Sequence, residues 1–287
     1  MIHAVSPLRY PGGKVKLYSY VKDILTENDL IGSATYVEPF AGGAGLAIKL
    51  LLNNDVKKII LNDLDPAIYC FWIAVLNHTD EFCHLIDNAN ITVDEWARQK
   101  AIYKRADTSD LLGFAFSVFF LNRTNVSGVL NAGIIGGLNQ SGAYKIDARF
   151  NKERLKELIY KIAQSQNKIT ILNMDANTLI SSSILSKSRK TLIFFDPPYV
   201  NKGARLYQNF FNENDHIVLS KSISRCKKKW ITTYDTSELI ENLYSGYQKG
   251  KICLNYSVQK KKREQELVFF SHNLKVPTKF LNNTFHI

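Results

Sequence analysis

The chain has 287 residues, of which 45% are hydrophobic and 11% aromatic, a composition that suits a globular protein of one large domain with an insertion, or of two domains. Lysine and arginine number 37 against 26 aspartates and glutamates, and the net charge of +11 at pH 7 indicates a polyanionic partner more than a small acidic substrate. Because the four cysteines show no metal-ligand spacing and the sequence has neither an export signal nor an apolar run long enough to cross a membrane, we expect a soluble, cytoplasmic protein that holds no metal.

The first motif is RYPGGK at residues 9–14, a turn that precedes a helical pattern of apolar residues up to Leu25. Glycine lets the backbone approach a ligand closely, and Lys14 stands near the expected helix start, where its ammonium group can reach a carboxylate. By itself the motif is not specific, because a lysine after a glycine turn is more often solvated.

A strand, a glycine loop and a helix follow in the order that begins a nucleotide-binding α/β sheet. Residues 35–37 predict the strand, residues 38–45 (EPFAGGAG) the loop, and residues 46–52 the helix. The spacing is neither the Gly-x-Gly-x-x-Gly of dinucleotide-binding proteins nor that of a phosphate-binding P-loop. A second strand at residues 58–61 leads to Asp63, about 20 residues past the loop, where an acid can accept hydrogen bonds from ribose hydroxyls. Loop and acid together favour an adenosine-containing cofactor over a structural turn.

The pattern changes between about residues 71 and 164. Two amphipathic helical stretches at residues 92–105 and 109–121 lead into a polar, glycine-rich segment, residues 122–151. A long loop inside a domain is usually functional, and the arginine, asparagine, threonine and glutamine side chains of this one are those that contact bases and phosphates. We expect a nucleic-acid-binding insertion, with a solvated surface loop as the alternative.

The rest of the chain predicts helices and strands around one apolar strand that ends in Asp-Pro-Pro-Tyr. Helices are expected at residues 155–163 and 216–225, and strands at residues 168–172, 191–195, 230–233, 252–256 and 266–271. The strand at 191–195 runs directly into Asp196, which places this carboxylate at the carboxyl end of the strand, where open α/β sheets bind ligands.

The Asp-Pro-Pro-Tyr corner has the chemistry to hold a flat base that bears an amino group. Pro197 and Pro198 fix two φ angles and lack N–H groups, so the turn is stiff and the Pro197 carbonyl is open to a ligand. The Asp196 carboxylate and this carbonyl can accept the two hydrogens of an amino group while Tyr199 stacks on the ring. A purine or a cytosine has this shape, although Asp-Pro-Pro also ends strands in proteins without such a site.

With RYPGGK, EPFAGG, FLNRTN and DPPY in this order, the chain resembles the Dam-like DNA adenine methyltransferases of class alpha, the D12 type. The resemblance spans nearly the whole chain. It implies an α/β fold: a Rossmann-like, S-adenosylmethionine-dependent methyltransferase sheet with a mostly helical target-recognition insertion. Residues 1–70 and 166–287 would form the catalytic and cofactor-binding domain, and residues 71–165 the DNA-binding target-recognition domain.

The resemblance also implies roles for single residues. Cofactor-binding residues would be Tyr10, Gly12, Lys14, Glu38, Pro39, Phe40, Gly42, Asp63, Asp175 and Asp196, with Asp63 on the ribose and Asp175 on the adenine. Catalytic residues would be Asp196, Pro197, Pro198 and Tyr199, and DNA-binding residues Arg123, Thr124, Asn125 and Ser127, of which Arg123 can contact a guanine. Some members of the family have tryptophan at the position of Tyr10. The loop after Asn125 follows a sequence of its own, which leaves the recognised DNA site open.

The implied reaction transfers the methyl group of S-adenosylmethionine to the exocyclic amino group of adenine in double-stranded DNA, with the target nucleotide flipped out of the helix. Asp196 would position and polarise the amino group, and the reaction needs no metal. A bacterial or phage origin and a cognate restriction endonuclease are expectations from the family alone. An RNA or protein-amide methyltransferase, a cytosine-amino methyltransferase and a non-catalytic nucleic-acid-binding protein are the alternatives.

Overall fold

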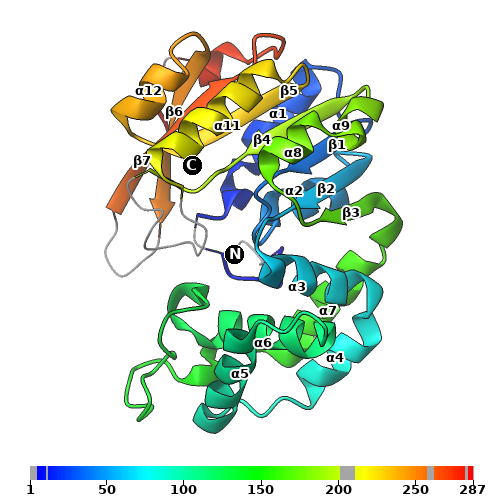
Figure 1. Cartoon of the computed structure of the whole chain (residues 1–287), viewed down its shortest axis with the longest axis vertical. Helices are drawn as coiled ribbons and strands as arrows, with labels where there is room; N and C mark the ends of the chain where they lie inside the picture. Colours follow the sequence, from blue (N-terminus) through cyan, green and yellow to red (C-terminus); the bar gives the residue numbers. More distant parts are fainter. Residues whose placement is uncertain (1–4, 11, 201–210, 257–261, 282–283, 287) are drawn as a thin grey trace.

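Eight strands of the described part of the chain form one sheet in the order β3-β2-β1-β4-β5-β7-β6-β8 (Figure 1). The structure is a computed structural model that describes residues 5–10, 12–200, 211–256, 262–281 and 284–286. The strands are β1 (Thr35–Glu38), β2 (Lys58–Asn62), β3 (Ile169–Leu172), β4 (Thr191–Phe195), β5 (Lys229–Asp235), β6 (Gln248–Tyr256), β7 (Lys262–Phe270) and β8 (Thr284–His286). Neighbours among β1 to β5 are parallel, whereas β7 runs antiparallel to both β5 and β6.

Strand β4 lies in the middle of the parallel part of the sheet, between β1 and β5. All five of its residues are buried, as is typical of an apolar strand in a sheet that is covered on both faces. Leu192 and Phe194 belong to the core on one face, and Ile193 and Phe195 to the core on the other. The chain connections reverse direction between β1 and β4, and the carboxyl ends of strands at such a switch point form a ligand-binding crevice.

Helices cover both faces of the sheet. One face packs against α1 (Tyr18–Glu27), α2 (Gly45–Leu52) and α3 (Pro66–Asn77), and the other against α8 (Ala176–Ser181), α9 (Ser183–Lys187), α11 (Glu213–Arg225) and α12 (Glu238–Leu243). Short 3-10 helices are η1 (Lys14–Leu17), η2 (Val126–Gly128), η3 (Ile146–Arg149), η4 (Gln166–Lys168) and η5 (Thr278–Phe280). This α/β/α layering around a doubly wound sheet is Rossmann-like, which confirms the predicted fold class.

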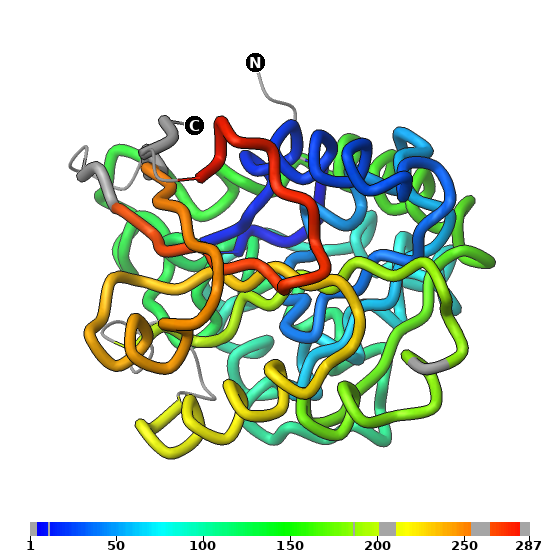
Figure 2. Tube along the Cα trace, turned by 90° about the horizontal axis from the view of Figure 1, so that it is seen from above, coloured from blue at the N-terminus to red at the C-terminus, as the bar shows by residue number. Residues whose placement is uncertain are grey.

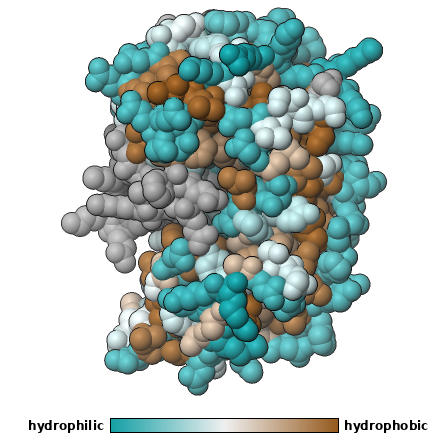
Figure 3. All heavy atoms as spheres, in the orientation of Figure 1, coloured by the Kyte–Doolittle hydropathy of each residue, from teal (hydrophilic) through white to brown (hydrophobic). Residues whose placement is uncertain are grey.

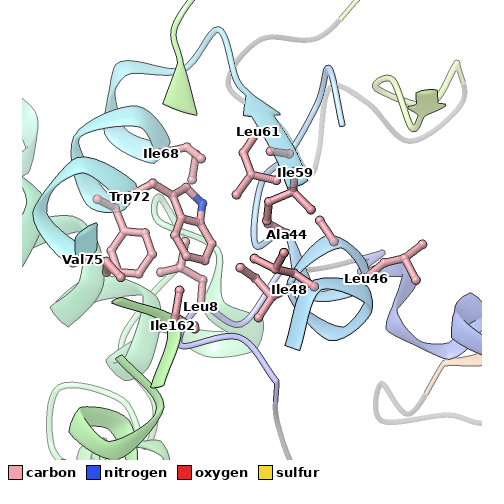
Figure 4. Packing of buried hydrophobic residues seen from close by; sticks show 14 of the residues in the cluster. Leu8, Ala44, Leu46, Ile48, Ile59, Leu61, Ile68, Trp72, Val75 and Ile162 are labelled. Carbon is pink, nitrogen blue, oxygen red and sulfur yellow. The ribbon is translucent and has the colours of Figure 1, made fainter. Parts of the chain in front are cut away.

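Four further helices lie below the sheet in Figure 1: α4 (Thr79–Asp87), α5 (Val93–Arg105), α6 (Leu111–Thr124) and α7 (Lys152–Ala163). Their core is continuous with that of the sheet, because the Phe71 ring of α3 stacks on Phe119 of α6 at 6.2 Å and meets Phe82 of α4 edge-on at 5.9 Å. Figure 4 shows side chains of α2, α3, α7 and β2 meeting in this core around Trp72. Helix α3 therefore ties the helical insertion to the sheet.

The end of the chain returns to α1. Asn28 Nδ2 donates to Lys275 O at 2.8 Å, Asn28 Oδ1 accepts from Lys275 N at 2.9 Å, and the rings of Tyr20 and Phe280 lie 4.1 Å apart. Figure 2 shows this segment, in red, running beside the blue helix α1. These contacts hold α1 against the sheet. The face drawn in Figure 3 is mainly hydrophilic, with hydrophobic atoms in separate groups.

Most of the predicted elements are confirmed within a few residues, and the clearest difference is the end of α6. The sequence predicts a polar loop from Asn122 onward, but α6 continues to Thr124. Both side chains are buried and bonded to main-chain carbonyls: Asn122 Nδ2 donates to Arg9 O at 2.8 Å, and Thr124 Oγ1 donates to Phe120 O at 2.7 Å. Polar residues can thus continue a buried helix where each finds a hydrogen-bond partner.

Candidate active site

A pocket of about 340 Å³ lies at the carboxyl ends of β1, β2, β3 and β4. It brings together residues from segments far apart in the sequence, as the motifs predict. The predicted site residues that line it are Tyr10, Gly12, Lys14, Glu38, Pro39, Phe40, Asp63, Arg123, Asp175, Asp196 and Pro198. Of the predicted cofactor-binding residues, only Gly42 does not line the pocket directly.

Gly42 supports the wall of the pocket from behind. Its φ is +45°, and a Cβ atom added to it would lie 2.7 Å from the ring of Tyr10, so this position suits glycine alone. Its N–H donates to Asp63 Oδ2 at 2.8 Å, and its carbonyl accepts from Trp72 Nε1 at 3.0 Å. The glycine loop is thus fixed to the end of β2 and to α3, and the Tyr10 ring lies directly against it.

Two of the predicted cofactor carboxylates also hold the backbone. Asp63 Oδ1 accepts from the N–H of Asp65 at 3.0 Å, and burial raises the pKa of Asp63 to about 6. Asp175 caps the N-terminus of α8, where its Oδ1 accepts from the N–H groups of Asn177 at 2.9 Å and Thr178 at 3.2 Å. Since each carboxylate oxygen has two lone pairs, these bonds leave acceptor capacity for the hydroxyl or amino groups of a ligand.

Glu38 is the last residue of β1 and is 7% exposed. Burial raises the pKa of Glu38 to about 8; the charge of Asp196 raises it as well, whereas the charge of Lys14 lowers it. Much of this carboxyl group is therefore protonated at neutral pH, and a cation bound beside it would lower its pKa. A positively charged ligand bound here would therefore favour the ionised form of Glu38.

Asp196 follows β4 and is held from two sides. The Thr233 hydroxyl, from β5, donates to Asp196 Oδ1 at 2.8 Å, and Lys14 Nζ lies 2.9 Å from Asp196 Oδ2. The same ammonium group donates to Gly12 O at 2.9 Å and to the hydroxyl oxygen of Tyr199 at 2.8 Å. Lys14 thus reaches a carboxylate, as its place after the glycine turn suggests, and that carboxylate is the one at the Asp-Pro-Pro-Tyr corner.

Tyr199 is buried, with 5% of its surface exposed. Its hydroxyl donates to Glu266 Oε1 on β7, and Glu266 Oε2 lies 3.5 Å from Lys14 Nζ. Pro197 and Pro198 are buried as well, and Pro198 lines the pocket. The hydroxyl of Tyr199 is therefore engaged within the protein, and stacking of its ring on a base stays a prediction.

Sequence reasoning missed three residues that support this corner: Thr233, Asp235 and Glu266. Asp235 Oδ1, at the end of β5, accepts from the N–H of Val200 at 3.0 Å and so holds the chain just after Tyr199. The place of Thr233 and Asp235 at the carboxyl end of a predicted strand could have revealed them. No local pattern in the sequence indicates Glu266, because it comes close to the Asp-Pro-Pro-Tyr corner through the antiparallel pairing of β7 with β5.

Arg123, predicted to contact DNA, lies near the end of α6 and is half-buried. Its Nε donates to Arg149 O at 2.6 Å, and Nη1 lies 3.4 Å from Pro7 O. Burial, then the charges of Arg9, Arg149 and Arg154, lower the pKa of Arg123 to about 9. Part of the guanidinium group therefore holds the protein backbone.

The other three predicted DNA-binding residues differ in exposure. Thr124 and Asn125 are fully buried, and Asn125 Oδ1 accepts from Trp96 Nε1 at 2.6 Å, which anchors the start of the loop. Ser127 is exposed and has a φ of +57°, so it stands at a tight turn of the backbone. Contact with DNA stays a prediction for these residues and for Arg123.

Carboxylates outnumber cations in the lining of the pocket: Glu38, Asp63, Asp65, Asp175 and Asp196 stand against Arg9, Lys14 and Arg123. Such a set suits a ligand with hydroxyl groups, amino groups and a positive charge better than it suits a phosphate. Among the described residues, no group of three His, Cys, Asp or Glu side chains is arranged to hold a metal ion. In the same part of the chain, no helix is long and apolar enough to cross a membrane.

Comparisons of the sequence with known proteins point in the same direction. The model of the D12 class N6 adenine-specific DNA methyltransferase family matches residues 10–281. The protein named Type II methyltransferase M.MjaIII, from Methanocaldococcus jannaschii, is 24% identical over 270 residues, which cover 88% of this chain and 89% of that protein. The protein named Type II methyltransferase M.CviBI, from Paramecium bursaria Chlorella virus NC1A, is 24% identical over 242 residues, 84% of this chain and 86% of that protein.

Solved structures resemble the chain more distantly. A putative RNA methyltransferase from Pyrococcus horikoshii has a TM-score of 0.41 at 11% identity, with 92% of this chain and 85% of that chain covered. An rRNA methyltransferase from Streptomyces viridochromogenes has a TM-score of 0.39 at 12% identity, with 91% and 86% covered. Because the family model matches nearly the entire chain, this protein belongs to the D12 class N6 adenine-specific DNA methyltransferase family.

Proposed function

We propose that this adenine-specific DNA methyltransferase binds S-adenosylmethionine in the pocket at the carboxyl ends of β1 to β4 and methylates adenine at the Asp196 corner. The observation that supports this most directly is the Asp196 carboxylate, which Thr233 and Lys14 fix at the wall of that pocket. Methylation of an amino group needs an acceptor that is held in place beside the methyl donor. Asp196 meets this requirement.

The residues of the pocket fit the chemical groups of S-adenosylmethionine. Asp63, whose carboxylate keeps acceptor capacity, would accept from the ribose hydroxyls, and Asp175 would bind the adenine. Tyr10 and Lys14 would contact the methionine part, and Glu38, whose carboxyl group a cation would help to ionise, would lie near the positive charge. When bound, the cofactor supplies an electrophilic methyl group on a positively charged sulfur.

Asp196 and the carbonyl of Pro197 would then act on the amino group of the target base. Thr233 and Lys14 each occupy one lone pair of Asp196, on different oxygens, and the remaining lone pairs can accept from the amino group. These hydrogen bonds favour a pyramidal nitrogen, whose lone pair is then available to the methyl carbon. Methyl transfer to the nitrogen requires the amino group to lose one proton, and Asp196, the one carboxylate among the predicted catalytic side chains, would accept it.

The target nucleotide must leave the duplex for this chemistry, because the amino group of a paired adenine is engaged within the helix. Flipping it out costs about a few kcal/mol, which stacking on Tyr199 would offset in part. We propose that the helical insertion α4–α7, with Arg123 at the end of α6 and Ser127 in the loop that follows, binds the flanking duplex. The net charge of +11 supports a DNA partner. The type II names of the two relatives support a cognate restriction endonuclease as a functional partner.

Asp196→Asn tests the proposed reaction. Asparagine keeps the size and one acceptor oxygen but loses the charge, so methyl transfer to duplex DNA should fall by at least about 100-fold, whereas calorimetric affinity for S-adenosylmethionine should fall far less. Asp55→Asn is the matched control, because Asp55 is a buried carboxylate outside the pocket that binds Lys22 at 2.9 Å and the Tyr18 hydroxyl at 2.6 Å. Wild-type methylation by Asp196→Asn would remove Asp196 from the mechanism.

A further inference from the structure

We propose that Glu266 of β7 is a positioning residue for methyl transfer: it orients the Tyr199 ring through the tyrosine hydroxyl and shares the Lys14 ammonium group with Asp196. The inference rests on the proposed function, because it assigns Glu266 a role in the chemistry of that site. Neither the four motifs nor the chemistry of amino methylation points to this residue, since it lies on a strand of the sheet far from Asp196 in the sequence.

The burial of Glu266 is the first observation. Its side chain is 2% exposed, and a buried carboxylate is costly unless it is paired with hydrogen-bond donors or a cation. Oε1 accepts from the Tyr199 hydroxyl, and Oε2 lies 3.5 Å from Lys14 Nζ. Both partners belong to the predicted active site, so the charge of Glu266 is committed to the residues that act on the cofactor and on the target base.

The strand that holds Glu266 makes this arrangement stiff. β7 pairs antiparallel with β5, and Glu266 lies opposite Asp235 in the register. Two strands therefore approach the Asp-Pro-Pro-Tyr corner side by side: β5 contacts it through Thr233 and Asp235, and β7 through Glu266. A side chain mounted on a central strand holds its partner more firmly than one on a loop.

Tyr199 is the first route by which Glu266 acts. The hydroxyl oxygen of a tyrosine lies on the axis about which its ring turns, so a hydrogen bond from it to a fixed carboxylate limits chiefly the first side-chain torsion, which sets where the ring lies. The Lys14 ammonium adds a second contact with the same ring, because it donates to the hydroxyl oxygen at 2.8 Å and lies 5.2 Å from the ring centroid. Glu266 and Lys14 together therefore hold in place the ring on which a target base would stack.

Lys14 is the second route. Its ammonium group is buried between two carboxylates, 2.9 Å from Asp196 Oδ2 and 3.5 Å from Glu266 Oε2. Attraction by Glu266 draws positive charge away from Asp196, and Asp196 is a better acceptor for the target amino group when its own charge is less neutralised. Loss of the Glu266 charge would leave Lys14 closer to Asp196 and weaken that acceptor.

The test compares Glu266→Gln, Tyr199→Phe and the double variant, with Asp55→Asn as control. Glutamine keeps the shape of Glu266 without the charge, and phenylalanine keeps the ring of Tyr199 without the hydroxyl. Asp55 is a fair control because it too is a buried carboxylate bonded to one lysine and one tyrosine. It lies just before β2, at the amino end of that strand, whereas the pocket lies at the carboxyl ends. Single-turnover methylation, cofactor affinity, melting temperature and the fluorescence of 2-aminopurine in place of the target adenine are measured for each.

We expect Glu266→Gln to slow single-turnover methylation by about 10- to 100-fold at saturating cofactor and DNA, with cofactor affinity changed by less than about threefold. The 2-aminopurine signal should be brighter than in the wild type, since a ring that is held less firmly in place quenches it less. Because both substitutions break the same contact, the double variant should be within about threefold of the slower single variant. Asp55→Asn should methylate at the wild-type rate.

Two results would overturn the inference. The first is a methylation rate and a 2-aminopurine signal in Glu266→Gln that equal those of Asp55→Asn. The second is a double variant whose loss of rate is the product of the losses of Glu266→Gln and Tyr199→Phe. If Glu266→Gln does not fold, Tyr199→Phe decides alone, since a wild-type rate and signal in that variant contradict a role for the hydroxyl. Failure of the proposed function would be a different result, namely a wild-type protein that does not methylate adenine in duplex DNA.

Discussion

The hydroxyl of Thr233, on β5, donates a hydrogen bond of 2.8 Å to Oδ1 of Asp196, at the end of the neighbouring strand β4. Thr233 is fully buried, so this bond is sheltered from water and fixes the rotation of the carboxylate. Thr233, which lies outside the Asp-Pro-Pro-Tyr motif, therefore decides which lone pairs of Asp196 remain for a target amino group.

Thr233→Val should slow methyl transfer. Valine keeps a β-branched side chain in the strand but removes the donor, so Asp196 Oδ1 loses a partner and the carboxylate can turn. We expect a loss of about tenfold in single-turnover rate, the equivalent of one hydrogen bond to a charged group. Thr233→Ser restores the hydroxyl and should retain most of the activity. Equal rates for the valine variant and the wild type would show that Asp196 needs no such support.

Gly42→Ala should destabilise the protein and weaken cofactor binding. The φ of +45° is unfavourable for alanine, and its Cβ atom would lie 2.7 Å from the Tyr10 ring. The left-handed backbone alone costs about 1 to 2 kcal/mol, measured as the free energy of unfolding in urea. Gly246→Ala is the control, since an added Cβ there would meet no atom within 4 Å. Similar losses in both variants would contradict a special role of the glycine loop.

Glu38→Gln should change the pH dependence of stability. Burial raises the pKa of Glu38 to about 8 from an ordinary value of 4.5, so the folded protein keeps a proton that the unfolded chain releases between these values. The protonated carboxyl stabilises the folded protein fully below the ordinary pKa of 4.5, and this stabilisation is lost as pH rises through the folded-state pKa of about 8. Glutamine does not titrate. The free energy of unfolding of the variant should therefore rise relative to that of the wild type by up to about 1.4 kcal/mol per pH unit between pH 5 and 8, with no further rise above pH 9.

Urea unfolding of both proteins at several pH values checks this prediction, because the other titrating groups cancel in the difference. A difference in the free energy of unfolding that stays constant with pH would show that Glu38 ionises as freely in the folded protein as in the unfolded chain.

Arg123→Ala should weaken DNA binding alike for all sequences. The Nε atom of Arg123 already donates to Arg149 O at 2.6 Å, and Nη1 lies 3.4 Å from Pro7 O, so two of its three nitrogens contact the protein and the group is less free to align a pair of donors with a guanine. A phosphate contact can use the remaining donors. In a plot of the logarithm of the DNA association constant against the logarithm of the salt concentration, the slope should then be smaller by about one. A loss of about 1 to 3 kcal/mol at a single base position, with other sequences unaffected, would instead establish a base contact.

The cofactor half of the fold and the centre of the site could be predicted because their signals are local. An apolar run directly before Asp196 places that residue at the end of a buried strand, and a glycine loop between a strand and a helix has few other structures. The resemblance to a known family then joined these local signals into one pocket.

The supporting residues could not be predicted because their places depend on long-range pairing. Glu266 reaches Tyr199 only through the register of β7 on β5, and no short stretch of sequence determines that register. The polar character of Thr124 and Asn125 predicts that they are loop residues. Their side chains are instead buried, where they hold α6 and the following loop through bonds to Phe120 O and Trp96 Nε1.

Transfer of a labelled methyl group from S-adenosylmethionine decides whether this site methylates the exocyclic amino group of adenine in duplex DNA. Duplex DNA of random sequence and RNA are each incubated with the wild-type protein and with Asp196→Asn, digested, and separated into nucleosides. We expect label only in N6-methyl-2′-deoxyadenosine, confined to one short sequence, with at least about 100-fold less in the variant. Label in methylated cytosine, or in RNA with none in DNA, would contradict it.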